Sequence, residues 1–387
     1  MNPWWISALA AVLIGHFGLN LAIYNRINAT GLPRKLIKSI VYVFFVWTLL
    51  FPALVMWLHP ETLKGLAAGA SSQVSIPLWL WVYGWLCLAA LPVFGIPWLL
   101  WRPIFGLEWV TAPRTTEVVD VQQETSNPLP LTPRCRRHAA LPMNQIFELA
   151  VEEIDLPVAG LPAELNGYQI AHLSDIHLTG DVHLDFARYV VDRATAFEPD
   201  LIAVTGDIID ERECVDWLET IFGDARASDG CYFVLGNHDT RIPNPAETRQ
   251  AMEQAGWTDL GCHTLSVSLR NVETSLIGNE FPWFPRTPVD AEDSSRFRLL
   301  LSHSPDQFQW ARQHRVTLML AGHTHGGQGR LPLAGPLLSP SFHGSRYASG
   351  DFYRPPTTLH VSRGLSGTHL LRINCRPELS LLKLRSI

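Results

Sequence analysis

Residues 316–328 read VTLMLAGHTHGGQ, and this stretch determines how the rest of the chain is interpreted. The apolar run Val316–Leu320 is typical of a buried strand, and two histidines follow it with one residue between them. Residues i and i+2 of an extended backbone point the same way, so His323 and His325 can face one point at the end of this strand. Imidazole is a common metal ligand, but two histidines in a turn also have a purely structural interpretation. A metal site is therefore expected only if other strands supply matching ligands.

Metal-binding side chains follow other apolar runs of the chain as well. Strands are predicted at 168–173, 201–205, 231–235 and 299–301, and a polar cluster comes directly after each of them. In open α/β sheets, ligands bind outside the carboxyl ends of the strands. Asp and Asn are also common turn residues, so each cluster alone has an ordinary explanation. Taken together with His323 and His325, the clusters favour one shared site, and their members are Asp175, His177, Asp207, Asp210, Asn237, His238, Asp239 and His303.

From Phe147 onward, strand-like runs alternate with segments that have helical spacing. The helical segments are expected at 184–197 and 245–255. This alternation predicts a buried sheet flanked by helices. After Thr357 the pattern predicts strands alone, including one at Leu370–Ile373.

The first hundred residues are apolar and nearly uncharged, unlike the remainder of the chain. Spans of about 20 apolar residues cross a bilayer, and the segments 4–24, 38–58 and 77–101 meet that requirement. The alternatives are buried core helices or a cleaved signal peptide. A signal peptide needs a basic start, which Met1–Trp5 lacks, and three successive spans exceed any signal peptide. We therefore expect residues 1–103 to form a multi-pass membrane domain whose partner is the lipid bilayer.

Basic residues in the short loops predict the orientation of these spans. The first loop carries Arg26, Arg34, Lys35 and Lys38, whereas the second carries Lys64 beside Glu61. The positive-inside rule then places everything after the third span in the cytoplasm, at the face of the inner membrane. Residues 104–146 are rich in Pro, Thr and Arg, and they predict an irregular linker to a catalytic domain at 147–387.

Charge and cysteine content exclude several classes of function. The net charge of −6 argues against a nucleic-acid partner, because phosphate-backbone binding needs clustered Lys and Arg. The six cysteines are scattered and show no C-x-x-C pair, which argues against structural zinc and against a disulfide framework. This cysteine usage favours a reducing compartment.

The order of the polar clusters resembles the calcineurin-like metallophosphoesterases. The matching motifs are Asp175-Ile176-His177, Gly206-Asp207-Ile208-Ile209-Asp210, Gly236-Asn237-His238-Asp239, His303 and Gly322-His323-Thr324-His325. The resemblance covers residues 147–387 and implies a two-sheet β sandwich flanked by helices. The stretches 173–178, 322–328 and 372–378 further resemble the membrane-tethered branch of that family, which includes hydrolases of UDP-2,3-diacylglucosamine.

The same resemblance implies a role for each motif residue. It makes His238 the catalytic acid and Asp210 the residue that orients it, while Asp239 has a supporting role. It implies two divalent ions, and favours manganese. Nitrogen and oxygen ligands without thiolate also suit iron or zinc. The ligands of the first ion would be Asp175, His177, Asp207 and His325, and those of the second Asp207, Asn237, His303 and His323.

The sequence therefore predicts a metal-dependent hydrolase of a lipid-linked phosphoester at the cytoplasmic membrane face. The most concrete substrate is UDP-2,3-diacylglucosamine, cleaved at its pyrophosphate to UMP and a lipid phosphate. The alternative is a broad phosphodiesterase or phosphatase acting on other lipids, wall intermediates or nucleotides. A scaffold without turnover is disfavoured, because the ligand set and His238 are intact.

Two loops are expected either to shape specificity or simply to cover the sandwich edge, namely Glu280–Pro285 and Leu331–Tyr353. Arg330 and Arg346 are expected to contact a nucleotide or diphosphate. The remaining histidines of the soluble part match no ligand position, so structural or surface roles are expected for them. They are His172, His183, His263, His314, His343, His360 and His369.

Overall fold

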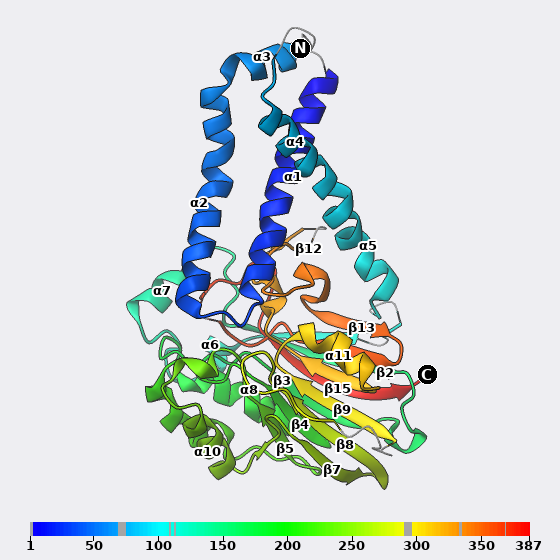
Figure 1. Ribbon diagram of the computed structural model, residues 1–387. Coiled ribbons are helices and arrows are strands. Elements are labelled where there is room, and N and C mark those ends of the chain that lie inside the picture. The colour runs from blue at the N-terminus through cyan, green and yellow to red at the C-terminus, as the bar shows by residue number, and fades with distance from the viewer. Residues whose placement is uncertain are drawn as a thin grey trace. The chain divides into compact units, whose positions relative to one another are not determined.

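The computed structural model describes residues 3–68, 75–107, 110–111, 114–289, 296–332, 335–367 and 369–387. The chain divides into two compact units. Unit 1 comprises Met1–Ile104 together with Phe342–Arg346, and unit 2 comprises Phe105–Ser341 together with Tyr347–Ile387. Unit 1 is built mainly from helices, whereas unit 2 is built from sheets with helices around them (Figure 1).

Three stretches of unit 1 and its border are long and apolar enough to cross a membrane, as predicted. They are Trp4–Asn28, Lys35–Leu58 and Leu78–Phe105. The third is interrupted by a wide π-helical turn at Leu91–Gly95, because Pro92 cannot donate a backbone hydrogen bond. The helices are α1 (Pro3–Asn28), α2 (Arg34–Leu58), α3 (Pro60–Ala68), α4 (Leu78–Ala90) and α5 (Ile96–Phe105). The sequence did not predict α3.

A buried histidine joins three of these helices. His16 of α1 contacts the Tyr83 hydroxyl of α4 through Nδ1 at 2.5 Å. Its Nε2 lies 3.0 Å from the carbonyl oxygen of Thr48 on α2. In a bilayer, an apolar side chain gains little free energy by packing against another helix instead of against lipid. Polar contacts of this kind therefore help to hold apolar helices together.

Unit 2 contains a seven-stranded and a six-stranded sheet, both mixed. In the first sheet, β3, β4 and β5 are parallel to one another, and β15 pairs antiparallel with β3. Its order is β1 (Arg114–Asp120), β2 (Glu148–Val158), β15 (Glu378–Ser386), β3 (Gln169–Leu173), β4 (Leu201–Thr205), β5 (Cys231–Val234) and β6 (Thr258–Asp259).

The second sheet supplies two further parallel strands, β9 and β10, which pair with each other. Its order is β13 (Gly350–Arg354), β14 (Thr357–Val361), β10 (Leu318–Ala321), β9 (Phe297–Ser302), β8 (Val272–Asn279) and β7 (Thr264–Leu269). A short hairpin, β11 (Arg330–Leu331) with β12 (Gly335–Pro336), follows β10.

Alternating side chains of the strands build two cores. In β4, Leu201 and Ala203 pack between the two sheets with side chains such as Leu299. Ile202 and Val204 face the other side, where they pack beneath the helices. Period-two burial on both faces explains why these strands are continuously apolar.

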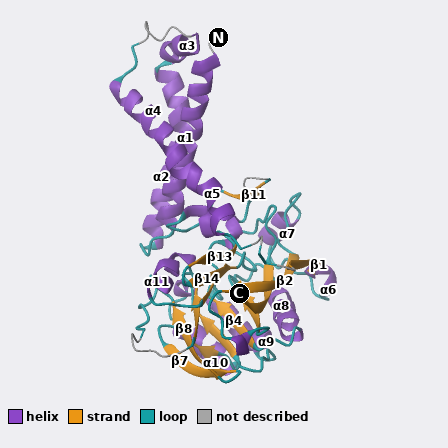
Figure 2. Ribbon diagram, turned by 90° about the vertical axis from the view of Figure 1, so that its right-hand side faces the viewer, coloured by secondary structure: helices purple, strands orange, loops and turns teal. Residues whose placement is uncertain are grey.

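Helices flank both sheets, as the sequence predicts (Figure 2). Those beside the first sheet are α8 (Leu184–Ala196), α9 (Leu218–Phe222) and α10 (Ala246–Gln254), while α11 (Phe308–Gln313) contacts β14 of the second. The architecture is the expected one, in which an α/β sandwich follows N-terminal apolar helices along the chain.

Two expectations about irregular and regular segments are wrong. Within residues 104–146, for which a linker was predicted, Arg114–Asp120 forms β1 and extends the first sheet beside β2. The same segment contains α6 (Val121–Glu124) and α7 (Pro133–Ala139), while Pro113 lies outside the described residues.

Conversely, the predicted strand Leu370–Ile373 is irregular, with a single bridge from Ile373 to Gly329. Here Leu371 is exposed and Arg372 is buried, which reverses what an apolar strand would require.

Candidate metal centre

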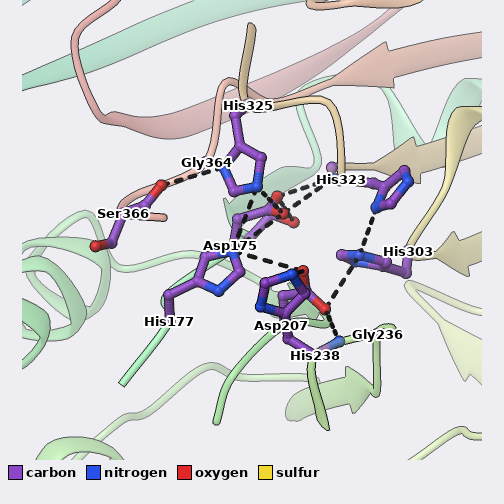
Figure 3. Close-up of polar contacts among 12 residues, drawn as sticks. Asp175, His177, Asp207, Gly236, His238, His303, His323, His325, Gly364 and Ser366 are labelled. Atoms are coloured by element: carbon purple, nitrogen blue, oxygen red, sulfur yellow. Dashed lines mark hydrogen bonds and ion pairs between the residues drawn. The ribbon is translucent and has the colours of Figure 1, made fainter. Parts of the chain in front are cut away.

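The predicted site residues lie at the carboxyl ends of β3, β4, β5, β9 and β10, and the structure brings them together (Figure 3). The backbone there is unusual. Left-handed φ angles occur at Asp175 (+53°), His177 (+51°), Asp207 (+52°), His323 (+69°) and His325 (+51°). Non-glycine residues rarely adopt this conformation, and such strain persists at functional sites where the surrounding fold enforces it.

Two glycines leave space for the carboxylates of the site. A Cβ atom on Gly236 would lie 2.3 Å from Oδ1 of Asp207. A Cβ atom on Gly364, whose φ is +68°, would lie 2.6 Å from Cβ of Asp175. Gly364 was not among the predicted site residues, because it reaches the site from the far end of the sequence.

The first ligand cluster consists of Asp175, His177, Asp207 and His325. Nδ1 of His177 lies 2.6 Å from Oδ2 of Asp210, and Nδ1 of His325 lies 3.1 Å from the carbonyl oxygen of Ser366. Both Nδ1 atoms are therefore donors, and the lone pair of each neutral ring is on Nε2. The two Nε2 atoms are 3.3 Å apart, a separation at which two lone pairs need a cation or proton between them.

The second cluster consists of Asp207, His303 and His323. Nδ1 of His303 donates to the carbonyl oxygen of Thr205 at 2.7 Å, which leaves its Nε2 as an acceptor. That Nε2 lies 3.1 Å from Oδ1 of Asn237, 3.1 Å from Nδ1 of His323 and 3.3 Å from Oδ1 of Asp207. Acceptors thus converge from several sides on one point.

Asp207 belongs to both clusters. Its Oδ1 faces His303, and its Oδ2 lies 3.5 Å from Nε2 of His177. This Oδ2 and Nε2 of His323 are buried and have no hydrogen-bond partner in the described part of the protein. Buried polar atoms are almost always paired, so an unpaired carboxylate oxygen shared by two clusters of imidazole and carboxylate groups fits two divalent cations. The donor set is nitrogen and oxygen only.

The pKa values of two neighbouring histidines show the same preference for positive charge. Burial lowers the pKa of His303, but Asp207 and Asp175 more than reverse this and raise it to about 9. Burial, followed by the neighbouring His303, lowers the pKa of His323 to about 3. The buried carboxylates therefore favour one positive charge between these rings.

Asp210 contacts two histidines at once. Its Oδ1 lies 2.6 Å from Nδ1 of His238, while its Oδ2 holds His177. Burial alone would raise the pKa of Asp210, but His177 and His238 lower it below its usual range. The ionised carboxylate therefore directs the Nε2 atom of both rings away from itself.

Arg241, which the sequence analysis did not select, also belongs to this group. Its guanidinium contacts both Asp210 and His238. The available signal was its position, two residues after the motif 236–239. Asp239 itself is buried and accepts backbone N–H groups from Gly236, Ile208 and Ile209, so it ties two strand ends together.

A C-terminal segment, Val361–Glu378, supports the first cluster from behind. The backbone N–H of Ser366 donates to the carbonyl oxygen of Asp175. The fully buried Arg372 donates to the carbonyl oxygen of Ser366 at 2.6 Å and to that of Arg363 at 2.8 Å. Arg372 thus positions the same carbonyl group that orients His325. Only the resemblance of 372–378 to a membrane-tethered branch pointed to this stretch.

One of the two predicted specificity loops lies beside the second cluster. The ring centroid of Trp283 is 5.0 Å from that of His323 and 5.5 Å from that of His303. Glu280 anchors this loop through Leu235 and Arg249. In the other loop, Leu331 is exposed, Leu333 lies outside the described residues, and Phe342–Arg346 groups with unit 1.

Two of the remaining histidines have buried structural partners. His172 lies 2.8 Å from the Thr205 hydroxyl, and His360 lies 2.6 Å from Asp351.

Comparison with known proteins gives a consistent result. The sequence profile of the calcineurin-like phosphoesterases matches residues 168–327. The uncharacterized metallophosphoesterase YkuE of Bacillus subtilis is 32% identical over 58% of this chain and 82% of its own length. Phosphodiesterase YaeI of Escherichia coli is 28% identical over 56% of this chain and 82% of its own length. UDP-2,3-diacylglucosamine pyrophosphatase LpxG of Chlamydia muridarum is 23% identical over 57% of this chain and 84% of its own length.

Proposed function

This chain belongs to the calcineurin-like phosphoesterases, which are metal-dependent phosphoester hydrolases, and we propose that it cleaves a lipid-linked phosphoester or pyrophosphate at a membrane surface. The observation that carries this proposal is that two clusters of potential metal ligands share Asp207, whose buried Oδ2 has no hydrogen-bond partner among the described residues. The membrane-length helices in the same chain favour a lipid-linked substrate over a soluble one.

The geometry supports the following assignment of ligands. Asp207 would be a ligand of both ions, since one of its carboxylate oxygens faces each cluster. Asp175, His177 and His325 complete the first site, and Asn237, His303 and His323 complete the second. This donor set suits manganese, with iron or zinc as alternatives, since it contains imidazole and oxygen but no thiolate.

Two bound divalent ions supply positive charge that attracts a phosphate oxyanion and stabilises the charge of the transition state. Within the protein, His238 in its doubly protonated form gives the proton on Nε2 to the oxygen of the leaving group, and Asp210, which accepts from Nδ1, orients the ring and stabilises its positive charge. The Arg241 guanidinium binds a non-bridging phosphate oxygen from the same side. Trp283 borders the second cluster and limits which groups fit beside it.

The name of the relative from Chlamydia muridarum suggests a specific substrate, UDP-2,3-diacylglucosamine. In that reaction, the oxygen of water forms a bond to one phosphorus and the bond from that phosphorus to the bridging oxygen breaks. UMP and a lipid phosphate are released, and the departing oxygen is protonated. We place this reaction at the cytoplasmic face of the inner membrane, because the basic residues Arg26, Lys35 and Lys38 occupy the loop predicted to be inside.

A broader activity is the second candidate. The relative from Escherichia coli is named only as a phosphodiesterase, and it is more similar to this chain than the pyrophosphatase is. A generic phosphodiesterase would use the same metal centre and would not require the lipid to be recognised.

One assay tests both candidates. The full-length protein, purified in detergent with Mn²⁺, is incubated with UDP-2,3-diacylglucosamine and separately with bis-p-nitrophenyl phosphate. Release of UMP supports the first proposal, whereas activity on the generic ester alone supports the second. His238→Ala should abolish both activities, and the matched control His263→Ala should abolish neither, because His263 is an exposed histidine that belongs to neither ligand cluster.

A further inference from the structure

The carboxyl edge of unit 2 carries a group of exposed apolar side chains next to the metal centre. Met143 is 75% exposed, Leu331 52%, Leu141 45% and Leu371 38%. These four residues are called the apolar rim. Other exposed large apolar side chains among the described residues of unit 2 include Leu131 and Leu338, at the same edge, and Val110, Val118 and Ile387 elsewhere.

Hydrogen bonds join the three chain segments that carry the rim. The Asn144 side chain donates to the carbonyl oxygen of Leu370 and accepts from the backbone N–H of Arg372. On the other side of this segment, the backbone N–H of Arg330 donates to the carbonyl oxygen of Ile373 at 3.0 Å. The rim is therefore formed by residues that are distant in sequence and that these hydrogen bonds hold together.

The rim adjoins the catalytic site directly. The backbone N–H of Ile373 donates to the carbonyl oxygen of Gln328 at 2.9 Å. Gln328 lies three residues after the proposed ligand His325, and its side chain donates to the carbonyl oxygen of His369. A molecule resting on the rim thus lies beside the first ligand cluster.

Basic side chains border the rim on α7. Arg136 and Arg137 are exposed, and within the described residues they donate to the backbone carbonyl groups of Leu131 and Pro133 rather than to acidic side chains. The nearby acidic residues are already engaged, since Asp181 pairs with Arg134 and Glu148 pairs with Arg376. An apolar surface flanked by uncompensated positive charge is complementary to a bilayer with anionic lipids.

The covalent structure keeps unit 2 close to such a bilayer. The third membrane-length stretch ends at Phe105, and the next residue, Gly106, already bridges Phe352 of β13. Unit 2 therefore begins without a long free tether. The opposite edge, in the loop before β5, presents the exposed polar residues Asp224, Arg226 and Ser228 instead.

We propose that the apolar rim and the arginines of α7 form a membrane-contacting surface of unit 2, which inserts into the anionic leaflet and opens the metal centre towards the bilayer. The site then receives a phosphate group at the depth of the lipid headgroups, and the acyl chains of the substrate stay in the leaflet. This inference rests on membrane insertion of the N-terminal helices and does not depend on which lipid is hydrolysed.

A fluorescence experiment on the full-length protein in nanodiscs tests the surface. Cys262 is the native cysteine that is not buried, so a Cys262→Ala background is labelled at Met143→Cys with an environment-sensitive fluorophore. A matched variant carries the label at Asp224→Cys. Lipids with a nitroxide near the carbonyl group should quench the label at position 143 and leave the label at 224 unchanged. Equal quenching at both positions, or no quenching at 143, would overturn the proposal.

A second measurement separates the surface from the choice of substrate. Leu371→Asp should lower kcat/KM for a membrane-embedded lipid substrate by about tenfold, because one buried apolar side chain contributes that much to binding. It should leave hydrolysis of bis-p-nitrophenyl phosphate unchanged. Equal losses on both substrates would contradict the surface. Quenching at 143 without any release of UMP from UDP-2,3-diacylglucosamine would reject the proposed substrate and retain the surface.

Discussion

The metal centre and the segment Val361–Glu378 meet at Asp175 and His325, yet they bury charge in opposite ways. In the centre, Oδ2 of Asp207 and Nε2 of His323 have no partner in the described protein. In the segment, the half-buried Arg363 lies between two acidic residues, with its Nε atom forming an ion pair at 2.8 Å with Glu378 and its Nη2 atom bonded to Glu152. One region leaves polar atoms for a ligand, whereas the other pairs its charges internally.

This difference distinguishes residues that bind a ligand from residues that support the fold around them. Unpaired buried carboxylates and imidazoles destabilise a fold, so they are retained only where a ligand later satisfies them. A buried ion pair adds little to the free energy of unfolding, but removing one partner of such a pair lowers that free energy considerably. Substitutions in the centre should therefore affect catalysis more than folding, and substitutions of the buried charged residues in the segment should affect both.

The largest effect is expected for Asp207→Asn. Loss of the bridging charge weakens both metal sites, and hydrolysis of bis-p-nitrophenyl phosphate should fall by more than about 10³-fold, beyond the effect of one electrostatic group. Asp192→Asn on the exposed face of α8 is the matched control and should leave turnover intact. Undiminished turnover in Asp207→Asn would reject the ligand assignment.

Arg241→Met should have the next largest effect. Arg241 contacts Asp210 and His238, and we propose that it binds the phosphate, so removing its guanidinium should lower kcat by about 10²-fold, the usual effect of losing one preorganised donor. Steady-state kinetics with saturating Mn²⁺ measure this loss. Arg241→Lys should restore part of kcat, since an ammonium group keeps the charge. If Met and Lys behave alike, Arg241 does not act through its charge.

A smaller effect on metal binding is expected for Arg372→Met. The carbonyl of Ser366 loses its buried donor, so the orientation of His325 relaxes, and the affinity for one Mn²⁺ should fall by about 10–100-fold. Titration of activity with Mn²⁺ reports this shift, and excess metal should restore kcat. A lower melting temperature with unchanged metal affinity would show that Arg372 is only a structural residue.

Arg376→Ala in the same segment should have the smallest effect. Arg376 pairs with Glu148 at 2.7 Å, but both side chains are about 40% exposed. Solvent screens such a pair, so the free energy of unfolding should change by no more than about 1 kcal/mol. Thermal unfolding and activity of this variant serve as the reference for Arg372→Met. If Arg376→Ala lowered stability or activity as much as Arg372→Met does, the effect of a substitution would depend on its position in the segment and not on the burial of the side chain.

The strand-end motifs were predictable because their signal is local. An apolar run followed by metal-binding side chains identified the carboxyl ends of β3, β4, β5, β9 and β10, and the structure brings every selected residue into one site. The assignment of each residue to one of two ions stays a prediction. The apolar N-terminal helices were equally visible, since length and hydropathy suffice to find them.

Residues that act through distant contacts were not predictable in the same way. Arg372 is an arginine in an apolar pattern, and nothing local shows that its partners are two backbone carbonyls of a preceding loop. β1 was missed because an edge strand with an exposed face lacks an apolar signature. The hairpin β7–β8 was not predicted either, although its strands alternate between polar and apolar residues. Its two-residue turn, Arg270–Asn271, has positive φ at both positions, as tight hairpin turns require.

The stoichiometry of bound metal tests the central claim most directly. The full-length protein is dialysed against Mn²⁺, and the metal content per chain is measured by mass spectrometry beside His177→Ala and His323→Ala. We expect two ions per chain in the unaltered protein and about one in each variant, because each histidine belongs to a different cluster. A single ion in the unaltered protein, or the loss of both ions in both variants, would contradict two sites joined by Asp207.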